Sequence, residues 1–318
     1  MVRKHTRRAA KAAFAVSFGV ALLIGLTAFG GTTPSGVAGA RGTLASAKKP
    51  TIVLGTKNFG EEYILGQLYG QALQAKGFNV RFKGSFGSSE LANTAIEHGK
   101  MNFYPEYTGV IALDLAKAKS APKTAAATYS VAKTYEQKHG QTLLKPTPFY
   151  DSDTFTMLTK TANKLGVKTI ADMKGKSFSY AGYPECDTRI TCILGFKKIY
   201  KLTHIKFVPI GTISVYTLLD QKKATAGDGF STDPQQLQHK KYRALTDTKH
   251  IFGFQNVAPV VSKKLLNSSA GKQIASISNK VSSLLTLGAM QAMNKAYVVE
   301  KATPKQIADG FLKANGLK

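Results

Sequence analysis

The chain has 318 residues, of which 44 are Lys or Arg and 18 are Asp or Glu, and its formal net charge at pH 7 is +26. This length suits one large domain or two lobes of ordinary size. The lysines are scattered in ones and twos without an Arg-rich patch, so we exclude a nucleic-acid-binding protein. A solvated basic surface, facing an anionic cell envelope or an acidic medium, accounts for the charge.

The N-terminus has the composition of an export signal. Basic residues precede an apolar run over residues 12–29, and small residues follow, with Ala-x-Ala patterns at residues 38–40 and 45–47. This order is that of a secretory signal peptide. We therefore expect residues 1–47 to be signal peptide and lead-in, with an uncleaved membrane anchor as the alternative. No later segment is long and apolar enough to span a bilayer, so we expect the mature chain to be soluble.

The first half of the mature chain alternates strand and helix patterns. Residues 51–56 form a β-branched strand candidate, and residues 61–76 carry apolar side chains at helical spacing, closed by Gly77. The alternation continues with a strand over residues 78–82, a helix over 88–96, a strand over 101–104 and a helix after Thr108. Such a series predicts a parallel sheet covered by helices on both faces.

The alternation resumes in the second half, and the last third, from Ser262 onward, is mainly helical. The further strand candidates are residues 155–158, 178–181, 206–209 and 225–230. The further helix candidates are residues 194–200, 216–222 and 271–287, and a last helix begins at Pro304. Two α/β lobes with a helical tail are the simplest organisation that fits this pattern.

The two cysteines, Cys186 and Cys192, lie six residues apart in the exported part of the chain. An oxidising compartment predicts a local disulfide, which closes a short loop and would contribute about 2 kcal/mol or less. Cys or His partners at ligand spacing are absent nearby, so we expect no metal site.

Known catalytic motifs are absent from the sequence. There is no Gly-x-Ser-x-Gly elbow, no Walker loop and no His-Glu-x-x-His helix. The six histidines are isolated, and none lies near Cys186 in the sequence to activate it as a nucleophile. We therefore expect no enzyme, no catalytic residue and no cofactor. An exported enzyme with an unrecognised site is the less favoured alternative.

Polar and aromatic residues follow three of the strand candidates, at residues 55–59, 104–109 and 229–233. In open α/β sheets, ligands bind beyond the carboxyl ends of the strands. These three turns are therefore candidate ligand loops around a cleft.

The same turns carry a resemblance to a known family. The chain resembles the glycine betaine/carnitine/choline-binding proteins of osmoprotectant ABC importers over nearly all of its mature length. The matching pieces include Thr56-Lys57-Asn58-Phe59-Gly60-Glu61, Tyr104-Pro105-Glu106-Tyr107-Thr108-Gly109 and Pro184-Glu185-Cys186-x-x-Arg189. The third piece departs from the family pattern, which has Phe at the position of Cys186.

The resemblance implies an α/β, two-lobed clamp of the type II periplasmic-binding-protein class, with two hinge crossings and the ligand in the cleft between the lobes. The chain would enter the second lobe near residues 151–156 and return near residues 254–259. Lobe 1 would then combine residues 48–150 with 260–318, and lobe 2 would be residues 151–259 with the crossings. Closure around the ligand is the expected motion.

The family's ligands carry a trimethylammonium group, which has no N–H and is held by aromatic faces, worth up to about 2 kcal/mol per desolvated face. Family members use a box of tyrosines. The resemblance implies that the corresponding box here is Tyr107, Phe155, Phe230 and Phe254. The last match can shift by one residue, onto Gln255. Phe keeps the π face but lacks the hydroxyl, and Tyr104 and Tyr150 are close enough in sequence to substitute.

Lys57 and Arg189 lie where the family places cations that engage a ligand carboxylate. Backbone N–H groups near Thr108, at an expected helix start, would add an anion site. The alternatives are a solvated Lys57 and an Arg189 engaged in a salt bridge, either between the lobes or locally with Glu185 or Asp187. If both cations point into the cleft, a carboxylated ligand is favoured over choline.

The resemblance thus implies the extracytoplasmic binding protein of an ABC transporter, which captures glycine betaine, carnitine or choline and delivers it to the membrane permease. We expect a monomer that is exported to the periplasm, cell envelope or medium, or tethered by an uncleaved N-terminal segment. Two other binding functions remain open: a protein for an amino acid or other small cationic ligand, and a binder of anionic envelope polymers.

Overall fold

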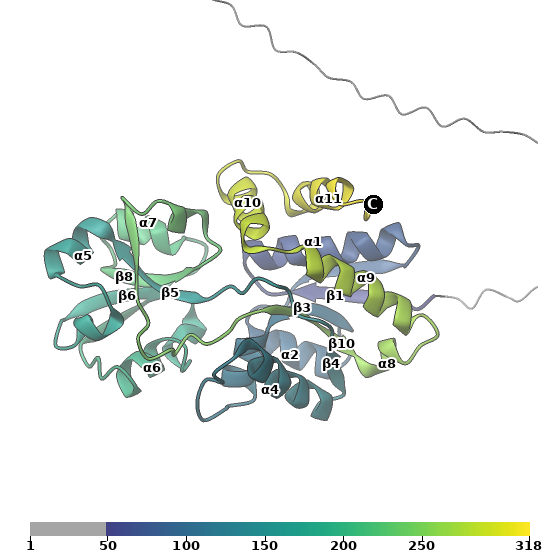
Figure 1. Cartoon of the computed structure of the whole chain (residues 1–318), viewed down its shortest axis with the longest axis horizontal. Coiled ribbons are helices and arrows are strands. Elements are labelled where there is room, and N and C mark those ends of the chain that lie inside the picture. The colour runs from purple at the N-terminus through teal and green to yellow at the C-terminus, as the bar shows by residue number, and fades with distance from the viewer. Residues whose placement is uncertain (1–48) are drawn as a thin grey trace, which may run out of the picture. The chain divides into compact units, whose positions relative to one another are not determined.

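The computed structural model describes residues 49–318, so the expected signal peptide and lead-in lie outside the described residues. Two five-stranded sheets form the centres of two lobes (Figure 1). Within the described residues, none of the helices combines the length and hydropathy needed to cross a membrane.

The sheet of lobe 1 has the strand order β2-β1-β3-β10-β4. Its strands are β1 (Ile52–Thr56), β2 (Val80–Ser85), β3 (Phe103–Tyr107), β4 (Gln141–Leu143) and β10 (Val257–Ser262). One face is covered by α1 (Gly60–Ala75), α8 (Lys263–Leu266), α9 (Gly271–Leu284), α10 (Leu287–Val298) and α11 (Pro304–Ala314). The other face is covered by α2 (Ser89–Glu97), the short α3 (Thr108–Val110), the π-helical turn η1 (Ile111–Leu115) and α4 (Ala125–Lys138).

The sheet of lobe 2 has the order β7-β6-β8-β5-β9. Its strands are β5 (Asp153–Leu158), β6 (Phe178–Gly182), β7 (Ile205–Pro209), β8 (Ala226–Phe230) and β9 (Tyr242–Leu245). The helices α5 (Thr159–Leu165) and α6 (Ile193–Lys198) cover one face, and α7 (Val215–Asp220) covers the other. Short 3-10 turns complete the lobe at η2 (Ile170–Met173), η3 (Pro184–Asp187) and η4 (Pro234–Leu237).

The prediction of an α/β fold with two lobes is confirmed, and the three strands of the first predicted series are parallel, but each sheet also contains antiparallel strands. Strands β1, β2 and β3 are parallel to one another, as are β6, β7 and β8. In contrast, β10 runs antiparallel to β3 and β4, and β5 runs antiparallel to β8 and β9. These two antiparallel strands, β5 and β10, are the ones that follow the lobe crossings. Their direction is not indicated by any local βαβ pattern in the sequence.

Two segments connect the lobes, one between β4 and β5 and one between β9 and β10. They lie side by side where Tyr150 pairs with Asn256. The Asp151 amide donates to the Gln255 carbonyl, and the Asn256 side chain donates to the carbonyls of Thr147 and Phe149. The two crossing segments are therefore hydrogen-bonded to each other where the chain passes between the lobes.

Glycines and caps account for the helix boundaries that the sequence indicated. Helix α1 is followed by Gly77 with φ +76°, a conformation that glycine adopts without a steric penalty. Helix α11 begins with a capping box, in which the Thr303 hydroxyl accepts from the Gln306 amide and the Gln306 side chain accepts from the Thr303 amide.

An aromatic cluster forms the centre of lobe 2. Phe155 is fully buried on β5, with its ring 5.0 Å from Tyr180, 5.2 Å from Phe196 and 5.6 Å from Phe178 between centroids. Contacts of this kind are typical of a packed core, where each ring contributes its full apolar area. Phe155 is thus part of the lobe 2 core.

We predict that Phe155→Ala lowers the free energy of unfolding by about 3–5 kcal/mol, because it removes a ring from a close-packed core. Urea denaturation measures this loss. Tyr150→Ala is the control, since Tyr150 is 48% exposed and its loss should change stability by only about 0.5 kcal/mol. Equal effects of the two substitutions would contradict the core position of Phe155.

Candidate functional site

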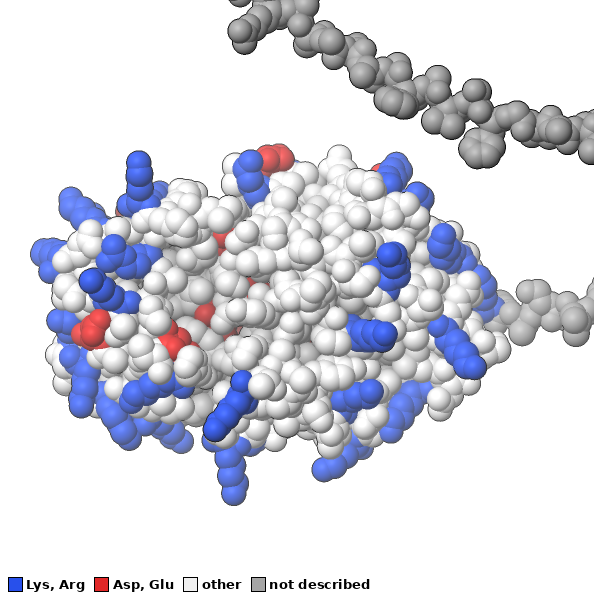
Figure 2. Space-filling view, in the orientation of Figure 1, with Lys and Arg blue, Asp and Glu red and all other residues white. Residues whose placement is uncertain are grey.

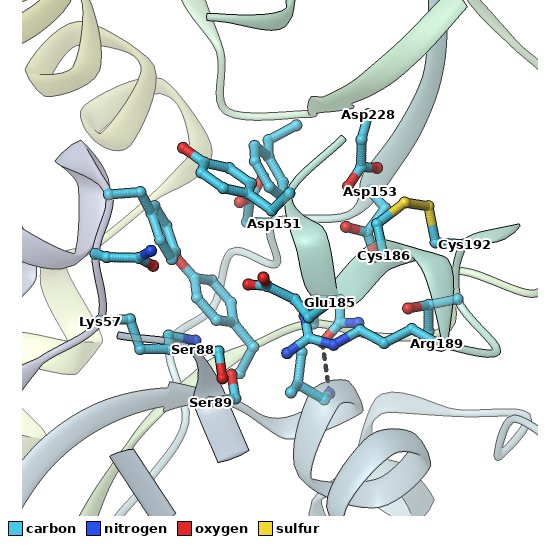
Figure 3. A pocket seen from close by; sticks show the side chains of 18 residues that line it. Lys57, Ser88, Ser89, Asp151, Asp153, Glu185, Cys186, Arg189, Cys192 and Asp228 are labelled. Carbon is cyan, nitrogen blue, oxygen red and sulfur yellow. Dashed lines mark hydrogen bonds between the residues drawn. A yellow bond between two sulfur atoms is a disulfide. The ribbon is translucent and has the colours of Figure 1, made fainter. Parts of the chain in front are cut away.

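A cavity of about 50 Å³ lies between the lobes and is lined by residues from both of them (Figure 3). It adjoins a wider cleft of about 740 Å³, with which it shares lining residues. We call these the inner cavity and the outer cleft. The residues common to both are Asn58, Phe59, Asp151, Tyr183, Asp228 and Phe230.

The lining residues stand at the carboxyl ends of parallel strands. Lys57 and Phe59 follow β1, Tyr107 ends β3, Tyr183 follows β6 and Phe230 ends β8. Parallel strands present their carboxyl ends at one edge of a sheet, where connecting loops leave a crevice. The two sheets turn these edges toward each other, which explains why loops far apart in the sequence line one cavity.

Three aromatic rings form a row along the inner cavity. The rings of Tyr107 and Phe59 stack at 6.1 Å between centroids, and those of Phe59 and Phe230 stack at 5.9 Å with an interplanar angle of 9°. Tyr107 and Phe59 belong to lobe 1 and Phe230 belongs to lobe 2. The aromatic row, Tyr107–Phe59–Phe230, therefore spans the junction between the lobes.

Lys57 lies beside this row, buried and fully engaged. Its ammonium forms an ion pair with Glu106, lies 3.8 Å from Glu62, and sits over the Tyr107 ring at 4.1 Å from the centroid. Burial raises the pKa of Glu62 to about 8, and the charge of Lys57 opposes this rise. Lys57 thus lines the cavity. Its charge is paired with buried carboxylates of lobe 1, so the alternative of a solvated Lys57 is not the arrangement formed.

Arg189 reaches from lobe 2 to lobe 1. Its guanidinium donates to both carboxylate oxygens of Glu90 at 3.1 Å, and its Nε lies 3.8 Å from Asp114. Of the alternatives left open by the sequence, the inter-lobe salt bridge is the one formed, with partners other than Glu185 and Asp187. Burial raises the pKa of Asp114 to about 6, although the Arg189 charge lowers it. The Arg189 bridge holds the two walls of the cavity together.

A short loop carries Arg189, and a disulfide closes it. Cys186 and Cys192 are bonded, with their Cα atoms 5.3 Å apart, and both line the inner cavity. The bond restricts the conformations of the intervening residues. Arg189 is therefore presented to lobe 1 from a constrained loop.

Lobe 2 contributes carboxylates to the cavity. Asp151 accepts hydrogen bonds from the Thr232 amide and the Ser231 hydroxyl. Burial raises the pKa of Asp153 to about 7, and the Arg189 charge opposes the rise. Burial, followed by the charge of Asp153, raises the pKa of Asp228 well above its usual range. The lobe 2 wall is thus acidic.

Several predicted site residues do not reach the cavity. Phe155 shares a sheet face with Asp153 but lies two residues further along β5, within the core. Tyr104 alternates with Tyr107 on β3 and is buried on the opposite face of that sheet. Tyr104 lies outside the cavity because its side chain points to the opposite face of its sheet, and Phe155 because it lies two residues further along its strand than Asp153.

The crossing segment places Gln255, rather than Phe254, against the cavity. Phe254 packs edge-on against the half-exposed Tyr150 at 6.2 Å, and neither residue lines the cavity. Gln255 is buried, lines the cavity and accepts from the Val110 amide at 3.0 Å. Gln255, onto which the last match can shift, is thus the residue of this segment that lines the cavity.

The backbone N–H and the hydroxyl of Thr108, where an anion site was expected, are already hydrogen-bonded within the protein. The Thr108 amide donates to the Asn256 carbonyl at 2.9 Å, and its hydroxyl donates to the Phe254 carbonyl at 3.3 Å. Gly109 allows this close approach, because a Cβ there would lie 2.5 Å from the Gln255 amide oxygen. The start of α3 serves the lobe crossing and has no free amide at Thr108 for a ligand.

The cavity residues that sequence reasoning missed include Phe59, Tyr183, Asp153 and Asp228. Phe59 stands inside the first matching piece, from which only Lys57 was assigned to the site. Asp153 and Asp228 lie at the beginning of β5 and within β8. A charged residue inside an otherwise apolar strand pattern is the signal that was available for both.

Comparison with known proteins identifies the family. Residues 50–314 match the substrate binding domain of the ABC-type glycine betaine transport system. A glycine-betaine-binding protein of Pseudomonas aeruginosa is 29% identical over 286 residues, which cover 85% of this chain and 90% of that protein. The chain therefore belongs to the family of substrate-binding domains of ABC-type glycine betaine transport systems.

Solved structures support the fold. A glycine betaine/carnitine/choline ABC transporter structure, 20% identical, superposes with a TM-score of 0.66 over 84% of this chain and 99% of that chain. Lactococcal OpuAC, closed around glycine betaine and 19% identical, superposes with a TM-score of 0.60 over 85% of this chain and 97% of that one. The architecture is that of type II periplasmic binding proteins. The chain is thus a non-enzymatic substrate-binding component of an ABC transport system, and members of its family are extracytoplasmic binding proteins.

We predict that Arg189→Gln separates the lobes of the ligand-free protein, because it removes the contacts to Glu90 and Asp114. The expected results are a larger radius of gyration by small-angle X-ray scattering and a loss of about 1–3 kcal/mol in unfolding free energy, since Asp114 stays buried. The control is Lys241→Gln, which breaks an exposed pair with Asp220 and should cost less than about 1 kcal/mol. Scattering and stability matching the control would refute an inter-lobe role.

Proposed function

We propose that this chain captures a quaternary-ammonium osmolyte, such as glycine betaine, carnitine or choline, and delivers it to the permease of its importer. The observation that carries the proposal is the aromatic row along the inner cavity. A trimethylammonium group cannot donate conventional hydrogen bonds, so its recognition requires π faces in a site shielded from water. Phe59 and Phe230 supply two such faces, one from each lobe.

The position of Lys57 supports this use of the row. Its ammonium already lies 4.1 Å from the centre of the Tyr107 ring and 5.5 Å from that of Phe59. The row therefore attracts positive charge in the ligand-free protein. Because Lys57 occupies the face of Tyr107, the ligand's onium group is assigned to Phe59 and Phe230, with Tyr183 beside them.

Ligand capture and lobe closure are coupled in this proposal. An onium group that contacts Phe59 and Phe230 together binds the closed arrangement better than an open one, since only closure brings both faces to it. The closed lobes then form the surface that the permease recognises. Binding and release follow from this difference in affinity, without any chemical step in the binding protein.

A second candidate is a small cationic amino acid. The acidic lobe 2 wall favours it, because a guanidinium or ammonium donates directly to carboxylates. Titration with arginine alongside the trimethylammonium compounds distinguishes the two candidates. Saturable stabilisation by arginine alone, read as a thermal shift, would assign the site to the amino acid.

We predict that Phe59→Ala and Phe230→Ala each weaken binding of the trimethylammonium ligand by about tenfold, since each removes a face worth about 1–2 kcal/mol. Phe59→Tyr and Phe230→Tyr keep the face and should stay close to the parent affinity. Phe82→Ala is the matched control, because Phe82 is a partly exposed aromatic on β2 outside the cavity lining. Calorimetric titration measures all five variants, and unchanged affinity in both alanine variants would remove the row from the site.

A further inference from the structure

The two cations that line the inner cavity are already paired with carboxylates that do not line it. Lys57 is engaged by Glu106 and Glu62, and Arg189 by Glu90 and Asp114. None of those four acids is part of the cavity lining. A ligand carboxylate would have to compete with these internal pairs, so the presence of Lys57 and Arg189 in the wall does not amount to a carboxylate site.

The carboxylates that do line the cavity have no cation. They are Asp151, Asp153, Glu185 and Asp228. No ion pair joins any of them to a Lys or Arg within residues 49–318. The wall that a ligand meets therefore presents carboxyl groups that form no ion pair with a Lys or Arg of the described residues.

Asp228 is the clearest case. It is 8% exposed and lines both the inner cavity and the outer cleft. Within the described residues, its one side-chain hydrogen bond is accepted from the Tyr180 hydroxyl at 3.5 Å, the outer limit for such a bond. Asp153 accepts no side-chain hydrogen bond from the rest of the described chain. Both carboxyl groups line the cavity with few hydrogen bonds from the protein, so they can accept from a donor on the ligand.

The strand register brings these two acids next to the aromatic row. Asp153 on β5 lies opposite Phe230 on β8, and Asp228 lies two residues earlier on β8. Directly opposite residues and residues two apart on one strand share a face, so Asp153, Phe230 and Asp228 project from the same face of the sheet. Figure 3 shows the Asp153 and Asp228 side chains side by side at the cavity wall.

The exterior has the opposite character. On the face shown in Figure 2, Lys and Arg side chains project around the periphery, whereas some of the few visible Asp and Glu atoms lie in the hollow near the middle. The negative charge of the cavity is therefore local to the site and is not a property of the surface as a whole.

We propose that the ligand of this cavity is a net cation without a carboxylate, whose onium group contacts Phe59 and Phe230 and whose hydroxyl or N–H donor faces Asp153 and Asp228. The inference rests on the proposed function and narrows its ligand class to quaternary ammonium alcohols over betaines. It reverses the expectation that Lys57 and Arg189 favour a carboxylated ligand. The carboxylate of a zwitterionic ligand would lie against the carboxyl groups of Asp153 and Asp228. Lys57 and Arg189 would not offset this, because both are already paired with other acidic residues.

Choline and glycine betaine form a matched pair of probes, because they share the trimethylammonium group and differ in a hydroxymethyl against a carboxylate. We expect calorimetric titration of the purified chain at pH 8 to give choline an affinity at least about tenfold higher, since repulsion between carboxylates about 5 Å apart exceeds 1.4 kcal/mol at protein dielectric values. The double variant Asp153→Asn/Asp228→Asn should reduce this preference to about twofold or less. A milder variant, Asp153→Asn alone, should reduce it in part.

The control variant Asp220→Asn/Glu300→Gln removes the same charge from exposed ion pairs and should keep the parent preference. Equal affinities, or tighter binding of glycine betaine, in the parent protein would overturn this inference while leaving the proposed function intact. A preference for choline that survives in a folded double variant, or in Asp153→Asn if the double variant does not fold, would also overturn it. Binding of neither probe would refute the proposed function itself, and the inference with it.

Discussion

Compensation of buried negative charge is the constraint on which the rest of this structure depends. In lobe 1, Glu106 pairs with Lys57, and Glu61 accepts from Tyr107 at 2.8 Å and from Asn294 at 2.7 Å, whereas neither oxygen of the buried Glu136 has a hydrogen-bond partner. In lobe 2, Asp153 and Asp228 have none of comparable strength. Burial without a paired cation disfavours the ionised form of these carboxyl groups, and a bound cation would favour it. Asp153 and Asp228 therefore favour a cationic ligand in the cleft.

Two kinds of contact hold the lobes together, and both affect the equilibrium between the open and closed arrangements of the lobes. The Arg189 bridge joins lobe 2 to Glu90 and Asp114 of lobe 1 in the absence of ligand. The aromatic row adds a second junction through Phe59 and Phe230. A ligand shifts the lobes toward closure only by as much as it binds the closed arrangement better. A bridge of moderate strength suits this role, because a stronger one would close the cleft before the ligand enters.

The sequence predicted most of the helices and strands and the family, but only some of the residues that line the cavity. Periodicity and glycines placed α1 and α11, since those signals are local. The cavity depends on the pairing of β5 with β8, residues more than 70 apart, which puts Asp153 beside Phe230 and sends Phe155 into the core. Lys57 was placed in the wall, yet its engagement by Glu106 depends on β1 and β3 lying side by side. Local patterns do not encode such long-range pairings.

Proton release on binding tests the central claim most directly. Burial raises the pKa of Asp153 to about 7 and the pKa of Asp228 well above its usual range. An entering cation lowers both pKa values, and protons leave. Calorimetric titration of choline at pH 7, in buffers of different ionisation enthalpy, measures the exchange. The account predicts net proton release that is abolished in Asp153→Asn/Asp228→Asn. Binding with no proton exchange, or with proton uptake, would contradict it.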